Sequence, residues 1–315
     1  MRNHISLRQS SLSSFLPNSE CNTSPYEGCT FTRRISTFSS SASFNSCTFD
    51  TLSVTGNGGA ISFSLQSHSL TIEESLFIHC TSSVHGGAIF VDSASDLTVK
   101  SSTFIACSAT VYGGGIYVYY GCESCSILFC TFTISQAQNG GGLMVSSDFS
   151  FSLSSSRAIS CDTSYSGGGM YHDSRSTHGS LTVLDSLFTN NRANYTVDKY
   201  LNRGGGAFED YRSTSYQSKY AFSFFNGNNA PDGFGHDICI HTQELSVNNI
   251  IHCFTTTQEH SLWNTKYEDY DDWLPLGTLS YLNTRDGDNN PYPDTHPEKS
   301  TWFAQITGTG RSDLV

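Results

Sequence analysis

The chain has 315 residues, enough for one large domain or two ordinary ones, and only 14% of them are charged. The formal net charge is −12, which excludes a nucleic-acid binder that depends on clustered Lys and Arg. Hydrophobic residues make up 37% of the chain, but they occur in short groups, none of which approaches the ~18 consecutive apolar residues of a membrane span.

Residues 1–43 are Ser-rich and irregular, and they contain no apolar stretch of the ~7–15 residues typical of a secretory signal. We expect a capping segment near CTFTRRISTFSS (29–40), because a stack of parallel strands must cover its end strand. Asn22 begins the sequence Asn-Thr-Ser, so it is a candidate N-glycosylation site.

A Gly-rich phrase recurs from residue 57 onward, as in HGGAIFVD (85–92). Its glycine pairs are Gly58–Gly59, Gly86–Gly87, Gly114–Gly115, Gly141–Gly142, Gly168–Gly169 and Gly205–Gly206. Each pair leads to an apolar residue, and these residues are Ile61, Ile89, Ile116, Leu143, Met170, Phe208 and, as a seventh member, Ile238. The first five steps are 28, 27, 27, 27 and 38 residues, and a period in the range of about 20–50 indicates a solenoid or a propeller.

Two further columns keep nearly the same phase. One consists of Phe49, Phe77, Phe104, Phe132, Ala158, Phe188 and Phe225. The other consists of Ile72, Val99, Ile127, Leu153 and Val183. Within one period, the segments 69–74, 75–80 and 86–91 alternate apolar and polar residues like short strands, and Ser-, Gly- and Asp-rich turns separate them.

Three strands in each period of ~27 residues are satisfied when the chain winds into a coil and each strand pairs with its equivalent ~4.8 Å away. We therefore predict an all-β fold, a parallel β-helix of about seven coils over residues 44–254, with three strands per coil. A propeller is the rival architecture, but its blade has four strands and a period of ~40 or more.

One long segment interrupts the repeat, and another follows it. Residues 190–203 form an insertion, which we expect to be an exposed loop, and it holds a second candidate glycosylation site at Asn194. The repeat stops near residue 255, and residues 255–315 are expected to form an acidic, aromatic cap and a linker-like tail.

The combination G-G-[AG]-[ILM] with an upstream F-x-x-[NC], as in Phe77–Cys80 and Phe104–Cys107, resembles the repeat of polymorphic outer membrane proteins. More broadly, it is similar to the right-handed β-helices of the pectin-lyase-like superfold. The resemblance covers roughly residues 44–254 and implies the fold, whereas function must be argued from a site. The chain departs from the bacterial family because no alternating ~10-residue membrane strands follow the repeat.

The sequence contains few candidates for a disulfide, a metal site or a catalytic site. Cys80, Cys107 and Cys161 share one column and are expected to be packed thiols, whereas Cys122-x-x-Cys125 is either a local disulfide or a pair of free thiols. No second Cys pair supports a zinc site, so we expect no metal and no cofactor. Asp92 and Asp173 are expected to be solvated turn residues.

The acidic and basic residues used by the galacturonase-like members of the superfold are not assembled in this chain, so we assign no catalytic residue. The prediction is a non-enzymatic protein, extracellular or on the cell surface, that presents loops and sheet faces for adhesion. Its partner is a carbohydrate or another protein, not a nucleic acid. The alternative is a polysaccharide lyase or glycoside hydrolase of the pectin-lyase-like fold, which requires carboxylates ~5–10 Å apart in a groove.

Overall fold

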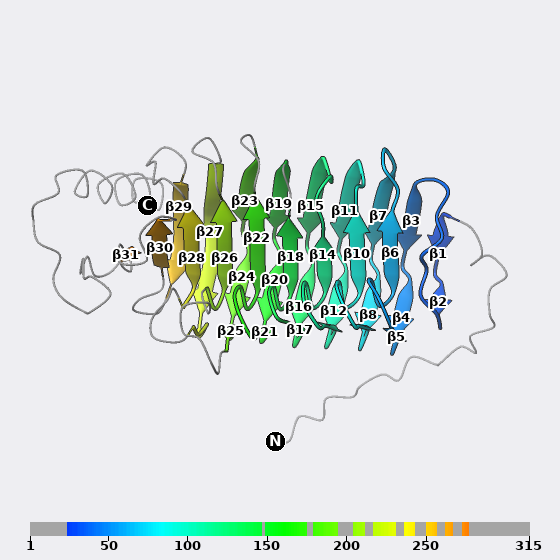
Figure 1. Ribbon diagram of the computed structural model, residues 1–315, viewed down its shortest axis with the longest axis horizontal. Helices are drawn as coiled ribbons and strands as arrows, with labels where there is room; N and C mark the ends of the chain where they lie inside the picture. The colour runs from blue at the N-terminus through cyan, green and yellow to red at the C-terminus, as the bar shows by residue number, and fades with distance from the viewer. Residues whose placement is uncertain are drawn as a thin grey trace, which may run out of the picture.

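Strands that lie about one period apart in the sequence pair side by side and stack along the long axis of the molecule (Figure 1). The computed structural model describes residues 24–146, 149–174, 179–194, 204–211, 217–230, 236–242, 250–256, 262–266 and 273–276. Six complete coils run from β3 to β26, preceded by β1 and β2 and followed by β27–β30. Among the described residues, every strand pair is parallel except β30–β31, which is antiparallel.

Each complete coil contributes one strand to each of four columns. The first column contains β1 (Tyr26–Glu27), β3 (Ala42–Asn45), β7 (Ser69–Glu73), β11 (Asp96–Lys100), β15 (Ser124–Leu128), β19 (Ser150–Ser154), β23 (Ser180–Leu184), β27 (Gln217–Asn226) and β29 (Ile250–Thr256). The second contains β2 (Thr30–Phe31), β4 (Thr48–Asp50), β8 (Leu76–Ile78), β12 (Thr103–Ile105), β16 (Thr131–Thr133), β20 (Arg157–Ile159) and β24 (Leu187–Thr189). These two columns form sheet A, because the long strand β27 belongs to both.

The other two columns form separate sheets. Sheet C consists of the two-residue strands β5 (Ser53–Val54), β9 (Thr81–Ser82), β13 (Ser108–Ala109), β17 (Gln136–Ala137), β21 (Asp162–Thr163) and β25 (Arg192–Ala193). Sheet B consists of β6 (Ile61–Ser64), β10 (Ile89–Asp92), β14 (Ile116–Val118), β18 (Leu143–Ser146), β22 (Met170–Ser174), β26 (Ala207–Tyr211), β28 (Ile238–Thr242), β30 (Leu262–Lys266) and β31 (Trp273–Leu276). The three columns expected from the sequence are confirmed, and sheet C adds a short fourth strand where only a turn was expected.

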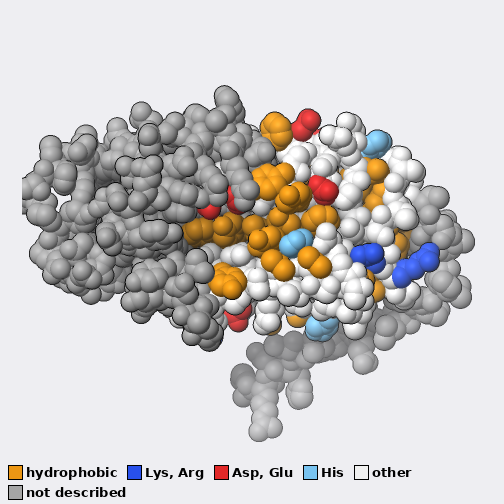
Figure 2. Space-filling model, viewed as in Figure 1, with side chains coloured by type: hydrophobic (Ala, Val, Ile, Leu, Met, Phe, Trp, Pro, Cys, Tyr) orange, Lys and Arg blue, Asp and Glu red, His pale blue; other side chains and the backbone are white. Residues whose placement is uncertain are grey.

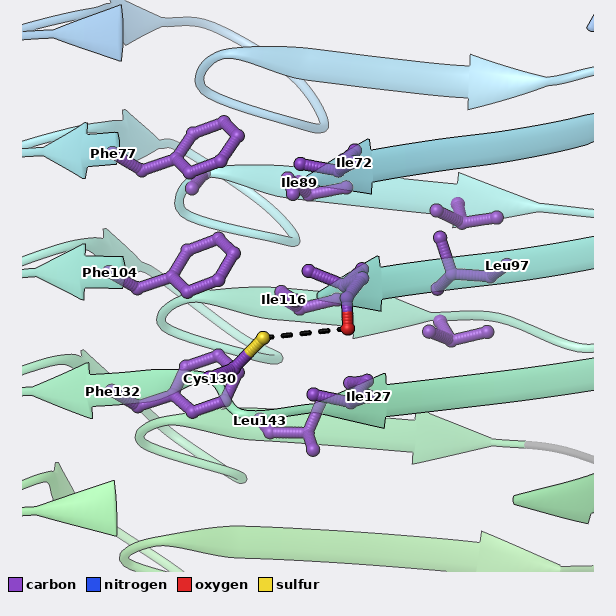
Figure 3. Packing of buried hydrophobic residues seen from close by; sticks show 14 of the residues in the cluster. Ile72, Phe77, Ile89, Leu97, Phe104, Ile116, Ile127, Cys130, Phe132 and Leu143 are labelled. Atoms are coloured by element: carbon purple, nitrogen blue, oxygen red, sulfur yellow. Dashed lines mark hydrogen bonds between the residues drawn. The ribbon is translucent and has the colours of Figure 1, made fainter. Parts of the chain in front are cut away.

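Like side chains stack inside the tube, as Figure 3 shows for three consecutive coils. The rings of Phe49, Phe77, Phe104 and Phe132 lie nearly parallel, with centroids 4.7–4.8 Å apart. Ile89 pairs with Ile116, and Val99 pairs with both Ile72 and Ile127, so both aliphatic columns are also in register. All these side chains are buried, and together they form one continuous core.

One position of the predicted register is wrong. Met170 pairs with Ala207, and Ala207 pairs with Ile238, so Ala207 rather than Phe208 belongs to the inner column. Phe208 pairs with Tyr171 on the outer side of the strand. The large apolar side chain was the natural candidate for the interior, but the glycines fix the phase, because Gly204 has the same positive φ as the first glycine of the earlier phrases.

The strand stacking also begins earlier in the chain than residue 44. β1 pairs with β3, β2 pairs with β4, and Ile35 bridges to Ile61, so the segment expected to be an irregular cap already contributes strands. Beyond residue 254, β30 continues sheet B and β31 reverses its direction.

The glycine phrase is required by the sharp turn before each strand of sheet B. Gly86 has a φ of +62°, a left-handed conformation that suits glycine, and a Cβ there would overlap the carbonyl oxygen of Ile89. A Cβ on Gly87 would overlap the carbonyl oxygen of Gly114 in the next coil. The first glycine therefore permits the turn, and the second permits the close stacking of coils. In the Gly-Gly-Gly phrases these two positions are Gly113–Gly114, Gly140–Gly141, Gly167–Gly168 and Gly204–Gly205, one residue before the predicted pairs.

The F-x-x-[NC] pattern describes the corner between the second column and sheet C. Phe77 and Phe104 point into the tube, while Cys80, Cys107, Cys161, Asn191 and Asn228 follow at the buried corner. Asn228 donates from Nδ2 to the carbonyl oxygen of Phe188 (3.0 Å), and Cys107 Sγ makes the equivalent weaker contact to Phe77 O (3.6 Å). The Asn or Cys thus satisfies the backbone of the preceding coil, which would otherwise be buried without a partner.

Candidate functional site

Sheet B carries apolar side chains on both of its faces. Ile89 and Val91 point into the core, whereas Phe90 between them points outward and belongs to a separate apolar cluster. The register continues this outer column through Tyr117, Met144, Tyr171 and Phe208. The outward column of a strand with one solvated face is normally polar, whereas this column is apolar and its members Phe90, Tyr117, Met144 and Phe208 are buried. We therefore take it as the first sign of a site.

A second row of rings lies beside this column, at the turns that precede the strands. His85 bridges to Tyr112, and their rings stack with centroids 4.8 Å apart and planes 5° apart. Tyr117 packs against both, at 5.1 Å from His85 and 5.3 Å from Tyr112. The turn row and the strand column therefore form one packed aromatic surface.

The far edge of the same surface is polar as well as aromatic. Tyr119 is 43% exposed and lies 6.0 Å from the ring of Tyr117. Tyr120 packs edge-on against Tyr119, and its hydroxyl donates a 2.9 Å hydrogen bond to Asp173 Oδ2. Asp173 pairs with Asp210 on the neighbouring strand, so two carboxylates lie side by side at this edge.

We call this surface the aromatic face, and it comprises Phe90, Tyr112, Tyr117, Tyr119, Met144 and Tyr171 together with His85. Figure 2 shows hydrophobic side chains gathered on the side that displays the sheet B strands in Figure 1, with a histidine among them and acidic groups nearby. The face runs across successive coils; Phe90, Tyr117 and Met144 are buried within it, whereas Tyr119 is exposed.

Burial keeps the titratable groups of the aromatic face neutral. Partial burial lowers the pKa of His85, so its imidazole stays uncharged near neutral pH. Burial raises the pKa values of Tyr117 and Tyr171, and the nearby carboxylate of Asp173 adds to both shifts. The phenolic groups therefore remain hydroxyls that can donate hydrogen bonds.

Inside the tube, polar groups replace aliphatic ones behind the C-terminal part of the face. His172 and Glu209 are fully buried register partners on the inner side of sheet B. Burial lowers the pKa of His172 to about 3 and raises the pKa of Glu209 to about 7. The Ser218 and Tyr220 hydroxyls favour the charged form of Glu209, but burial outweighs them.

The cysteines fall into different environments. Cys80, Cys107 and Cys161 are buried free thiols at one corner, and burial raises the pKa of Cys161 to about 12. Cys122 and Cys125 are also buried and are not disulfide-bonded, and Cys122 Sγ lies 3.3 Å from the carbonyl oxygen of Ser124. Among the described residues, no group of three or more His, Cys, Asp or Glu side chains is arranged to hold a metal ion.

The glycines, the Phe column and the residues at the coil corners are mostly structural. The glycine pairs and the Phe column shape the coils, as described above. Asp237 accepts a 2.8 Å hydrogen bond from Asn228, and His236 accepts one from the Ala230 amide, so this pair completes a corner. Asn194 is exposed directly after β25, as a glycosylation site requires, whereas Asn22 lies outside the described residues.

The expectation that Asp173 is a solvated turn residue is wrong. Asp173 is buried rather than solvated, because its carboxylate packs beneath Tyr120. Its nearest acidic neighbour in the register is Asp210 of the adjacent strand, whereas Asp92 lies further along the sheet. The corrected phase of the glycine phrase brings these two carboxylates together.

Sequence reasoning missed the aromatic face, although a signal was present. The strands of sheet B read Ile-Phe-Val, Ile-Tyr-Val and Leu-Met-Val, three consecutive apolar residues where a one-sided strand would alternate. Consecutive apolar residues in a strand indicate that both of its faces are covered or occupied.

Comparison with known families supports the architecture. A family model described as "Right handed beta helix region" matches residues 18–156. The chain is a right-handed parallel β-helix. The match covers the N-terminal coils, and the same strand pairing continues beyond it to β30.

Two further searches add no relative. No curated protein and no solved structure matches the chain significantly. Within the described part of the chain, no helix has the length and hydropathy needed to cross a membrane.

Proposed function

We propose that this chain is a non-enzymatic binding protein of the cell surface or extracellular space, and that its ligand is a neutral carbohydrate held on the aromatic face. The observation that carries the proposal is the continuous row of outward-directed rings from His85 to Tyr171 along sheet B, of which Tyr119 is exposed and His85, Tyr112 and Tyr171 are partly exposed. An apolar surface repeated over several coils suits a long, repetitive ligand better than a small compact one.

The chemistry of the face favours a sugar. Sugar rings present apolar C–H faces, which pack on aromatic rings, and hydroxyl groups, which need acceptors at the edge. Tyr119 is exposed and Tyr112 is partly exposed, so these two residues supply rings and hydroxyls, and Asp210 supplies a partly exposed carboxylate. The net charge of −12 disfavours an acidic polysaccharide.

The test is binding of neutral polysaccharides by the purified chain on a glycan array and by affinity electrophoresis. Tyr119→Asn should weaken binding about tenfold or more, because this ring is 43% exposed and replaceable without disturbing the core. Phe129→Asn is the matched control, because Phe129 is 57% exposed at a corner of sheet A. Equal loss with both variants, or no binding to any neutral glycan, would reject the proposal.

The location is tested separately. Asn194 should carry a glycan if the chain passes through the secretory pathway, so glycosidase treatment should increase its gel mobility and Asn194→Gln should abolish that change. Antibody labelling of intact, non-permeabilised cells should detect the protein. An unmodified Asn194 together with labelling only after permeabilisation contradicts a surface location.

A second candidate function rests on the pair Asp173 and Asp210. Adjacent strands are ~4.8 Å apart, and retaining glycosidases place two carboxyl groups about 5 Å apart. Release of reducing ends from a neutral polysaccharide, abolished by Asp210→Asn, would favour a glycoside hydrolase. Binding without any release favours the non-enzymatic protein.

A further inference from the structure

Exposed apolar side chains gather along the second column, the part of sheet A that contains β8, β12, β16, β20 and β24. Among the described residues, six large hydrophobic side chains are exposed, and four of them lie in this column or at its corners: Phe129, Ile134, Phe222 and Phe224. Partly exposed aliphatic side chains continue the row on the outward side of the strands, and they are Leu76, Ile78, Ile105, Ile159 and Leu187. We call these residues together the apolar strip, and such a concentration marks an interaction surface.

Two residues of the apolar strip occupy backbone conformations that disfavour their side chains. Phe129 and Ile134 are 57% and 52% exposed, and they have φ values of +54° and +55° at the two ends of β16. A left-handed conformation is an outlier for a bulky or β-branched residue. The equivalent corners of other coils mostly hold polar residues, among them Glu74, Ser101, Asp185 and Asn190. The turns therefore do not need these apolar side chains, which indicates a role outside the coil.

The apolar strip is almost free of charge in a strongly acidic chain. In the described strands from β8 to β27, the outward positions of the second column carry no carboxylate, and Arg157 is their only charged side chain. The whole chain has a net charge of −12, so two copies repel each other unless they meet on a face without acidic groups. A second copy of this chain is thus a partner that fits the strip.

We propose that the apolar strip is the interface of a reversible homodimer, in which two tubes lie side by side about a two-fold axis parallel to their length. A two-fold interface joins the same surface of both subunits, so each contact occurs twice. This inference does not depend on the ligand proposed for sheet B, because the strip lies on sheet A.

The two-fold axis sets each coil against the same coil of the other copy, with the strand directions reversed. The corner before β16 then lies opposite the corner after β16, so Phe129 of one copy packs against Ile134 of the other. In the same way, Leu76 on β8 lies opposite Ile78 of the other copy. The two strained, exposed residues thereby bury each other, which neither can do within its own coil.

Charged residues at the corners are complementary in this arrangement. Asp185 is exposed at the corner before β24, and Arg192 is exposed just after the opposite corner. The two-fold axis brings each Asp185 towards Arg192 of the other copy. Glu74 and His79, also exposed, are related in the same way across β8. Exposed pairs add little to affinity, but they favour one orientation over others.

The size of the apolar strip indicates a weak interface. Five strand spacings of ~4.8 Å from β8 to β27 give a length of about 24 Å, and the distance between corners is about 17 Å. The projected area of about 400 Å² is roughly half of the ~800 Å² that each partner buries in a standard interface, so we expect a dissociation constant in the micromolar range. Below that concentration the chain is monomeric, and Phe129→Asn remains a valid control for ligand binding.

Sedimentation velocity of the full-length chain, from about 1 to about 200 µM, tests the dimer. The wild type should change from monomer to dimer as its concentration rises. Phe129→Asn and Ile134→Asn should each weaken association about tenfold or more. Their urea midpoints should stay at or above that of the wild type, because Asn tolerates the left-handed conformation. Tyr119→Asn, which changes an exposed ring on another side of the tube, should associate like the wild type.

Charge reversal tests the orientation of the two copies. Asp185→Arg should weaken association, because it sets two cations opposite each other. Asp96→Arg is the matched control, because Asp96 is equally an exposed carboxylate but lies on the first column. A chain that stays monomeric up to about 200 µM, or normal association of Ile134→Asn, would overturn the proposal. Equal effects of the two charge reversals would reject the two-fold arrangement.

Discussion

Asn191 and Asn228 stack at the same corner of consecutive coils. The Asn191 side chain donates from Nδ2 to Asn228 Oδ1 at 2.9 Å, and the Asn191 backbone amide donates to the same oxygen at 3.0 Å. Asn191 Oδ1 also accepts a 2.9 Å hydrogen bond from the backbone amide of Cys161, and Asn191 Nδ2 donates a 2.9 Å hydrogen bond to the carbonyl oxygen of Ala158. One buried side chain therefore satisfies backbone groups of the coil before it and is itself held by the coil after it.

Removing this amide should destabilise the C-terminal coils. Asn191→Ala leaves the Cys161 amide and the Ala158 carbonyl without partners, and each such buried group costs about 1–3 kcal/mol. Asn191→Cys should lose less, because Cys occupies the same corner in other coils. Urea unfolding followed by circular dichroism measures the difference, and an equal loss for both variants would contradict this role for the corner residue.

The glycine turn allows steric overlap to be separated from backbone conformation. Gly86 and Gly28 have nearly equal φ values of +62° and +61°, but a Cβ on Gly86 would overlap the backbone at Ile89, whereas nothing lies within 4 Å of a Cβ on Gly28. Gly28→Ala should cost only about 1 kcal/mol, the conformational penalty. Gly86→Ala should cost several times more in the same urea assay, and comparable losses would show that overlap is unimportant.

Truncation of the aromatic core should cost more than truncation of a surface ring. Phe104 stacks between Phe77 and Phe132 and is fully buried, so Phe104→Ala should lower the free energy of unfolding by about 3–5 kcal/mol. Phe104→Leu keeps most of the volume and should lose less. Thermal and urea unfolding provide the measurement, and a loss below ~1 kcal/mol for Phe104→Ala would place the ring outside the core.

His172 and Glu209 should give opposing pH dependences of stability. The folded-state pKa of Glu209 is about 7, above its usual 4.5. Its contribution to the free energy of unfolding therefore increases by about 3 kcal/mol as the pH falls from 7 to 4.5. The folded-state pKa of His172 is about 3, below its usual 6.5. Its contribution to the free energy of unfolding therefore decreases by about 5 kcal/mol as the pH falls from 6.5 to 3. Between pH 6.5 and 4.5 the two effects largely cancel.

Single variants should separate the pH dependence of stability that each of the two residues contributes. Glu209→Gln should make stability fall steadily as the pH drops below 6.5, because Glu209 no longer offsets His172, and the lowered pKa of His85 acts in the same direction. His172→Gln should make stability rise relative to the wild type as the pH drops from 6.5 to 4.5, because His172 no longer offsets Glu209. Urea midpoints measured across this range test both, and parallel profiles for the two variants would mean that neither group is buried as described.

The periodic features of this fold were predictable because they depend on contacts between equivalent positions. Phe77 and Phe104, or Ile89 and Ile116, must resemble each other if they stack, so the sequence displays the stacking directly. The strand register near Phe208 was harder to predict, because a long insertion separates Phe208 from Met170 and only the glycines preserve the register. Sheet C was missed because two-residue strands leave no alternation to detect.

The candidate site was less predictable for a different reason. Tyr120 and Asp173 are far apart in the sequence. They are in contact only because the turn after β14 places Tyr120 near the end of β22, two coils further along sheet B. His172 and Glu209 fall at inner positions where the period demands aliphatic residues, and their burial follows from the register rather than from their own chemistry. Such departures from a repeat are visible in a sequence only after the phase is known.

The last described strand, β31, runs antiparallel to β30. A stack of parallel rungs is a template onto which a further identical rung of another molecule can add, which is how filaments elongate. Because β31 occupies the edge of β30 with a strand of reversed direction, it removes the matching surface at this end of sheet B. The direction of one short strand thus favours a molecule of finite length over an open polymer.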